Sequence, residues 1–150
     1  NAVTYASDAK TKLHIFELES AGMGFIVQLK NGHFLLYDGG MKGELPYLIE
    51  HMESLVPAGQ KPIIDAWLIS HAHIDHMGPL VTFANNKSYA DRVNIESVYF
   101  TEPSEKAEKL NGNVDGVTSN LVFCRTAPEY LKNSEGGKPN MYRFRTGSLF

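Results

Sequence analysis

The chain has 150 residues, of which 43% are hydrophobic and 21% are charged, so it is long enough to bury one core. Its formal net charge of −3 provides no global positive field and weighs against nucleic acid as a partner. Apolar stretches such as 62–70 fall well short of the roughly 20 residues that span a bilayer, so we expect no membrane partner. We therefore expect a single domain over residues 1–150.

Cysteine usage and the start of the chain carry little information about the compartment. Cys124 is the only cysteine, which excludes an intrachain disulfide and leaves both cytoplasmic and exported locations open. We interpret Cys124 as a small buried hydrophobic residue. The chain starts at Asn1-Ala2 without a methionine, which suggests processing or a cloning scar.

The first segments have the composition of strands. Lys12–Glu19, Gly24–Leu29 and His33–Asp38 are rich in β-branched, aromatic and leucine residues. Asn31-Gly32 separates the last two, and such a pair tolerates the positive φ angles of a tight hairpin turn. We expect three strands that lie antiparallel to their neighbours.

An amphipathic helix and a buried strand are predicted next. Six apolar residues recur at helical spacing, and Pro46 suits the first turn of the helix that they form. They are Leu45, Leu48, Ile49, Met52, Leu55 and Val56. Ile63–Ser70 is short, apolar and bounded by turn residues, which is typical of a strand that is buried in a sheet.

The remainder continues the alternation of helices and strands. We expect helices over Leu80–Ala84 with Pro79 at the start, Glu102–Leu110 and Thr126–Leu131, and strands over Val93–Phe100 and Asn140–Arg145. Residues 114–125 give no clear signal, and Thr146-Gly147-Ser148 is typical of a turn before a returning strand. The pattern predicts an α/β arrangement of layers.

The residues after the buried strand carry the chemistry. His71, His73, Asp75 and His76 place three imidazoles and one carboxylate within six residues. Neutral imidazole and carboxylate are ligands that zinc prefers, and a loop after a strand can bring such positions together. The spacing is not helical, so we expect a loop site, with Gly78 where the loop bends into the next helix.

Less specific interpretations stay open beside this one. The three histidines can also be an exposed polar loop, or unrelated side chains that hydrogen-bond to the backbone. His14, His33 and His51 lie in strand patterns or on the polar face of a helix, where histidine is more often structural than a ligand.

The run His71-x-His73-x-Asp75-His76 resembles the signature of the metallo-β-lactamase superfamily, and Asp38-Gly39-Gly40 resembles that family's first motif. The resemblance implies the N-terminal half of a four-layer αββα sandwich, a mixed sheet with flanking helices. It implies that His71 and His73 bind one metal ion, that Asp75 and His76 bind a second, and that Asp38 supports the metal loop. Asp38 can also be a simple turn residue before the two glycines.

The family completes its two sites with ligands from its C-terminal half, whereas no histidine follows His76 in this sequence. We therefore expect a truncated domain with an incomplete site, which binds metal weakly and less tightly in mild acid. A lone half also leaves a sheet face and an edge strand open, which favours a homodimer or a swapped strand.

The activity that the resemblance implies is hydrolysis by metal-activated water, with Asp75 orienting the water and with zinc as the metal. The small-molecule substrate stays open among esters, thioesters, lactones, β-lactams and phosphodiesters, because fold does not fix function. Two alternatives are an iron-dependent redox enzyme of the same fold and a non-catalytic fragment that only binds. Manganese is possible in place of zinc.

Overall fold

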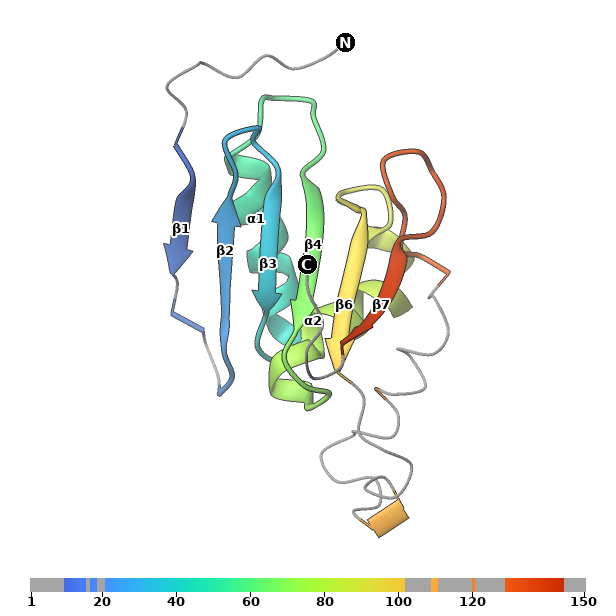
Figure 1. Cartoon of the computed structure of the whole chain (residues 1–150). Coiled ribbons are helices and arrows are strands. Elements are labelled where there is room, and N and C mark those ends of the chain that lie inside the picture. Colours follow the sequence, from blue (N-terminus) through green and yellow to red (C-terminus); the bar gives the residue numbers. More distant parts are fainter. Residues whose placement is uncertain are drawn as a thin grey trace.

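A computed structural model gives the fold of the chain, and it describes residues 10–15, 17–18, 21–101, 109–110, 120 and 129–144. The described elements are β1 (Lys12–Ile15), β2 (Gly24–Gln28), β3 (Phe34–Asp38), the 3-10 turn η1 (Lys42–Glu44), α1 (Leu45–Ser54), β4 (Ile63–Ile69), α2 (Ile74–Asn85), η2 (Lys87–Tyr89), β5 (Asn94–Ile95), β6 (Ser97–Thr101) and β7 (Asn140–Phe144) (Figure 1).

These strands form one mixed sheet of seven strands in the order β1-β2-β3-β4-β6-β7, with β5 paired to β4. The first three strands are antiparallel neighbours, as predicted, and β3, β4, β6 and β7 run parallel. The hairpin turn lies at Asn31-Gly32, where Gly32 has a φ of +80°, a conformation that glycine adopts without steric cost. The expected α/β class with a mixed sheet is therefore confirmed.

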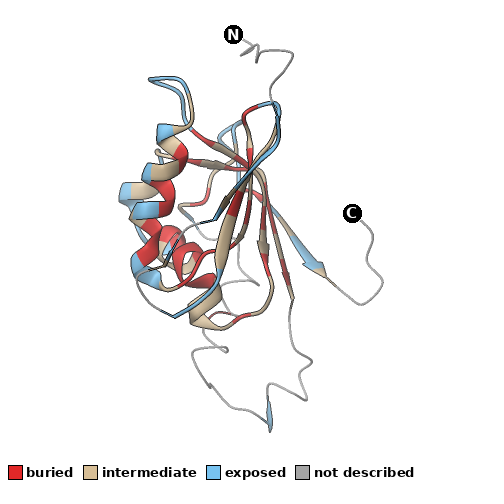
Figure 2. Ribbon diagram, turned by 90° about the vertical axis from the view of Figure 1, so that its left-hand side faces the viewer, coloured by how far each residue is buried: buried red, intermediate tan, exposed pale blue. Residues whose placement is uncertain are grey.

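The helices α1 and α2 cover one face of the sheet (Figure 2). The predicted amphipathic helix is α1, with Pro46 in its first turn, and it buries Leu45, Leu48, Ile49 and Met52. Against them lie the buried strand residues Ile26, Leu36, Trp67 and Val98. The helix face of the sheet thus holds the hydrophobic core.

The opposite face carries a row of apolar side chains that crosses the sheet. Strand register aligns these residues as neighbours from β1 to β7: Ile15, Phe25, Tyr37, Leu68, Tyr99 and Tyr142. Ile15 is 79% exposed and Tyr142 is 46% exposed, whereas the residues between them are half-buried. We call this row the open face.

Four predicted elements differ from the structure. Glu17 and Leu18 are not part of a strand, so β1 is shorter than predicted. The strand over Val93–Phe100 is divided at Glu96 into β5 and β6, although the Glu96 amide still donates to the Ile64 carbonyl of β4. Glu129 and Tyr130 form a turn instead of continuing a helix. The helix over Leu80–Ala84 begins earlier, at Ile74.

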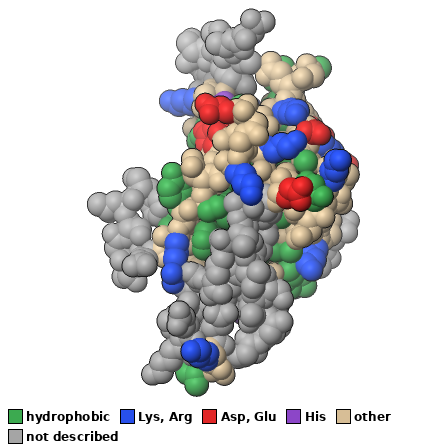
Figure 3. Space-filling view, turned by 90° about the vertical axis from the view of Figure 1, so that its right-hand side faces the viewer, with side chains coloured by type: hydrophobic (Ala, Val, Ile, Leu, Met, Phe, Trp, Pro, Cys, Tyr) green, Lys and Arg blue, Asp and Glu red, His purple; other side chains and the backbone are tan. Residues whose placement is uncertain are grey.

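Other predictions fall outside the described residues. They include most of the helix over 102–110, the start of the one at 126, Cys124, and the turn and strand after Phe144. Among the residues that are described, no helix is long and apolar enough to cross a membrane. Seen from the β7 side, basic, acidic and apolar side chains are mixed, and no field of a single sign is visible among them (Figure 3).

Candidate functional site

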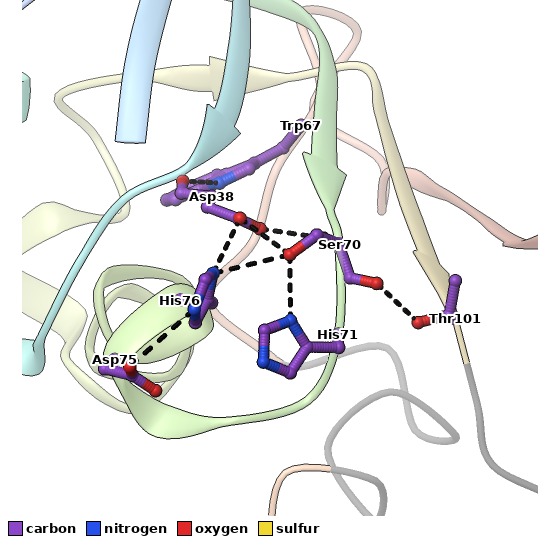
Figure 4. Close-up of polar contacts among 7 residues, drawn as sticks. All are labelled: Asp38, Trp67, Ser70, His71, Asp75, His76 and Thr101. Atoms are coloured by element: carbon purple, nitrogen blue, oxygen red, sulfur yellow. Dashed lines mark hydrogen bonds and ion pairs between the residues drawn. The ribbon is translucent and has the colours of Figure 1, made fainter. Parts of the chain in front are cut away.

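The candidate site lies at the carboxyl ends of the parallel neighbours β3 and β4. Asp38 is the last residue of β3, and Ser70 and His71 follow β4 directly. The chain then enters α2, whose first turn carries Asp75 and His76 (Figure 4). Carboxyl ends of adjacent parallel strands are a common place for functional groups, because both chains turn away from the sheet there.

Asp38 lies at the centre of the site and is fully buried. Its Oδ1 accepts from the Ser70 amide at 2.7 Å, and its Oδ2 accepts from the Ser70 hydroxyl at 2.7 Å. The ring of His76 adds a third bond, with Nδ1 at 2.8 Å from Oδ2. The Asp38 carbonyl accepts from Trp67 Nε1 at 2.8 Å. A buried carboxylate with this many donors is well compensated for its desolvation.

Asp38 also has a left-handed backbone, with a φ of +49°. Non-glycine residues adopt this conformation uncommonly, and aspartate is among the few that tolerate it. The conformation turns the chain into Gly39-Gly40 while the carboxylate points at the residues after β4. Asp38 is therefore both a turn residue and a contact of Ser70 and His76.

Three imidazoles gather beside this carboxylate. The ring centroid of His71 is 4.0 Å from that of His76 and 4.7 Å from that of His73. The pKa of His71 is lowered, first by burial and then by His76 and His73, while Asp38 and Asp75 act in the opposite direction. His71 is thus favoured in the neutral form that can bind a cation.

Asp75 lies on the outer side of the cluster. Its Oδ2 is 3.7 Å from Nε2 of His76, and about a third of its side chain is exposed. Its position in the first turn of α2 places the carboxylate near the positive end of the helix dipole. The structure thus brings Asp75 next to His76, and His76 next to Asp38 and His71.

The expectation of a pure loop site was wrong. Only His71 and His73 lie before the helix, and Asp75 and His76 are helical. Pro79 lies inside α2, and because proline has no amide proton, the Asp75 carbonyl has no partner at the next helical turn. Helical geometry, not loop curvature, sets the spacing between Asp75 and His76.

Gly78 has a different role from the predicted bend. A Cβ at this position would collide with the backbone of Met41 and Lys42. Gly78 therefore allows α2 to lie directly on the segment that follows Asp38. This close approach holds His76 within reach of Asp38.

The donor set fits zinc in its chemistry, since imidazole nitrogen and carboxylate oxygen are its usual ligands besides thiolate. The geometry does not close around an ion: within the described part of the chain, no three His, Cys, Asp or Glu side chains are placed to hold one. The four motif side chains are neighbours, but their ligating atoms do not meet at a common point without side-chain rotations.

The other histidines lie elsewhere. His33 Nδ1 contacts Asp65 Oδ1 at 2.7 Å, and His51 Nε2 contacts His14 Nδ1 at 3.2 Å. These contacts agree with the structural interpretation of His14, His33 and His51. The structure does not bring any of them to the motif.

Sequence reasoning assigned no role to three polar residues of the site. Ser70 contacts Asp38 and His71, and Thr101 Oγ1 donates to the Ser70 carbonyl at 2.7 Å. The buried Asn120 donates to the carbonyl of Ala72, between the first two histidines, at 2.6 Å. The position of Ser70 at the end of a buried strand is a usable signal, whereas Asn120 has none, because it lies in the stretch that could not be assigned.

One known family matches most of the chain. The family model described as the metallo-beta-lactamase superfamily matches residues 21–136. The match includes Asp38, Ser70 and the complete His71–His76 run. The chain belongs to the metallo-β-lactamase superfamily. No curated protein matches it.

Proposed function

We propose that this chain provides metal ligands of a metal-dependent hydrolase, with two zinc ions in the complete site. Membership of the superfamily supports a hydrolase as the class of the parent enzyme. The observation that carries the proposal is the contact of the buried Asp38 carboxylate with His76, beside the closely spaced rings of His71 and His73. Metal-binding histidines commonly donate their second ring nitrogen to a carboxylate in this way.

Each residue has a proposed role. His71 and His73 hold the first ion, Asp75 and His76 hold the second, and Asp38 orients His76 through Nδ1. When bound, the ions would lower the pKa of water and polarise the scissile group of the substrate. The proposed role of Asp75 in orienting a water molecule is supported by its partial exposure, which gives solvent access to the carboxylate.

The substrate class stays open among esters, thioesters, lactones, β-lactams and phosphodiesters. The first alternative function is a redox reaction at iron in the same fold. The family's di-iron flavoproteins carry glutamate where this chain has His73, which favours zinc. Metal analysis of the purified protein separates zinc from iron and manganese. The second alternative is a fragment that binds without catalysis.

Zinc titration tests the ligand set. We expect His71→Ala or His76→Ala to weaken zinc binding by at least tenfold in calorimetry at pH 7.5, whereas His33→Ala, at the distant Asp65 pair, leaves it unchanged. Binding should also weaken at pH 5.5, because protonated imidazoles do not ligate. Equal affinity in all three variants would refute the ligand assignment.

Hydrolysis of an ester and a phosphodiester by the zinc-loaded chain then separates an enzyme from a binding fragment.

We also propose that protein covers the open face. Exposed apolar rows of this kind are uncommon on monomers, and β1 and β7 are the edges of the described sheet. The occupant is either the second sheet that the family resemblance implies or a second copy, as a homodimer or with a swapped strand. Light scattering over a concentration series detects self-association.

A further inference from the structure

We propose that Ser70 is a positioning residue that sets the tautomer of His71. Its hydroxyl donates to Asp38 and so becomes an acceptor for the His71 ring, a two-bond arrangement that we call the relay. A single buried carboxylate would then orient two imidazoles, His76 directly and His71 through the serine hydroxyl. The significance of the relay for metal binding rests on the proposed function. The relay itself is a property of the chain's own side chains.

The hydroxyl of Ser70 lies between the carboxylate and the ring. Ser70 Oγ is 2.7 Å from Asp38 Oδ2 and 3.0 Å from His71 Nδ1 (Figure 4). It is 3.4 Å from Nδ1 of His76, a long distance for a hydrogen bond, and that nitrogen is much nearer to Asp38. The competent contacts of the hydroxyl are therefore Asp38 on one side and His71 on the other.

Proton counting gives the direction of these bonds. A serine hydroxyl has one proton to donate and two lone pairs, whereas an ionised carboxylate can only accept. The hydroxyl proton therefore goes to Asp38 Oδ2, and a lone pair of Oγ faces His71. The reverse direction would leave two oxygen lone pairs facing each other at 2.7 Å. His71 consequently carries its proton on Nδ1 and presents an unprotonated Nε2.

The same logic applies directly to His76. Its Nδ1 is 2.8 Å from Asp38 Oδ2, so this nitrogen also donates, and its Nε2 lies 3.7 Å from Asp75 Oδ2. In both rings Nδ1 therefore contacts the Asp38–Ser70 pair, and Nε2 is the nitrogen left to bind a cation. The described contacts of Ser70 do not include His73. The tautomer of His73 is therefore an internal control, which changes at Ser70 should leave as it is.

Ser70 is itself held on both sides. Its amide donates to Asp38 Oδ1 at 2.7 Å, and its carbonyl accepts from Thr101 on the neighbouring strand β6 at 2.7 Å. The hydroxyl is thus attached to a backbone that two adjacent strands fix in place. The tautomer of His71 is set before any cation binds, and this reduces the reorganisation that binding requires.

The experiment measures tautomers in the metal-free chain by nitrogen-15 NMR at pH 7.5, where each ring nitrogen is seen as protonated or bare. We expect His71 in wild type to be protonated on Nδ1. Ser70→Ala should give a mixture of tautomers at His71 and leave His76 in its wild-type state, while Ser70→Thr keeps the hydroxyl and restores His71. Ser54→Ala, which removes an exposed hydroxyl on α1, is the matched control.

Zinc affinity gives a second readout. We expect a loss of about tenfold to a hundredfold for Ser70→Ala and recovery in Ser70→Thr. A bare Nδ1 on His71 in wild type, or an unchanged tautomer in a folded Ser70→Ala, would overturn the proposal. If Ser70→Ala does not fold, wild type and Ser70→Thr decide the question, since both must show protonated Nδ1. The expected tautomers without zinc binding would refute the proposed function and leave the relay intact.

Discussion

Two aspartate–histidine pairs in this chain have almost the same contact distance and very different surroundings. His76 Nδ1 is 2.8 Å from Asp38, and His33 Nδ1 is 2.7 Å from Asp65. The Asp38 side chain is fully buried, whereas the Asp65 side chain is 34% exposed. Asp38 also accepts two bonds from Ser70. The pair distance alone therefore does not distinguish the two carboxylates, whereas burial and the additional donors do.

The largest expected effect comes from removing the negative charge of the buried carboxylate, Asp38. In Asp38→Asn an amide NH₂ replaces one acceptor oxygen and faces donors of Ser70 or His76. We expect the free energy of unfolding to fall by about 3 kcal/mol, because buried donors lose their acceptor. Zinc affinity should fall tenfold to a hundredfold. Urea unfolding and calorimetry measure the two effects.

Asp65→Asn is the control for this prediction. Solvent screens this pair, so we expect a loss of at most about 1 kcal/mol and no change in zinc affinity. Equal losses in the two variants would show that burial does not distinguish the pairs.

A smaller effect is expected from loosening the packing that holds the buried pair together. Gly78→Ala forces a Cβ into the backbone at Met41 and Lys42, so we expect a loss of about 1–3 kcal/mol in unfolding free energy. The NMR signals of His76 should shift, and those of His33 should not. Gly43→Ala is the matched control, because nothing lies within 4 Å of its added Cβ. Comparable losses in both would contradict the close approach of α2.

The smallest effect concerns a histidine whose ring partner is another imidazole. The pKa of His14 is lowered, mainly by burial and then by His51 and Lys12, against the opposing effect of Gln28. In acid the unfolded chain therefore takes up a proton that the folded chain resists. The contribution of His14 to the free energy of unfolding is fully present above about pH 6.5, and it declines as the pH falls from there toward the pKa of His14 in the folded chain.

His14→Gln should reduce this decline, as measured by urea unfolding between pH 7.5 and 5.5. Some decline should remain in the variant, because the pKa of His71 is lowered in the same direction. A variant with the full wild-type decline would show that His14 does not contribute to it.

The sequence was sufficient to predict the parts of the fold that local chemistry determines. Asn31-Gly32 predicted the hairpin, and the apolar spacing predicted α1. The location of the motif after β4 followed from the short apolar run before it. These signals are carried by residues close to one another in the chain, so they can be recognised without knowledge of tertiary contacts.

Long-range contacts set the features that were not predicted. Pro79 is a typical first residue of a helix, yet α2 begins five residues earlier, at Ile74. Gly78 gave the signal of a bend, whereas its role depends on Met41 and Lys42, more than thirty positions before it. Asn120 reaches the Ala72 carbonyl across 48 positions. No local pattern encodes such distances.

The parallel pairing of β3 with β4 has a consequence for the dynamics of folding. Asp38 and Ser70 are 32 positions apart, and their bonds form only when the crossover through α1 has brought the two strands together. The Ser70 amide points into a fully buried carboxylate, so its proton meets solvent only when this part of the sheet opens. The hydrogen-exchange rate of the Ser70 amide therefore reports how often β3 and β4 separate at this end of the sheet.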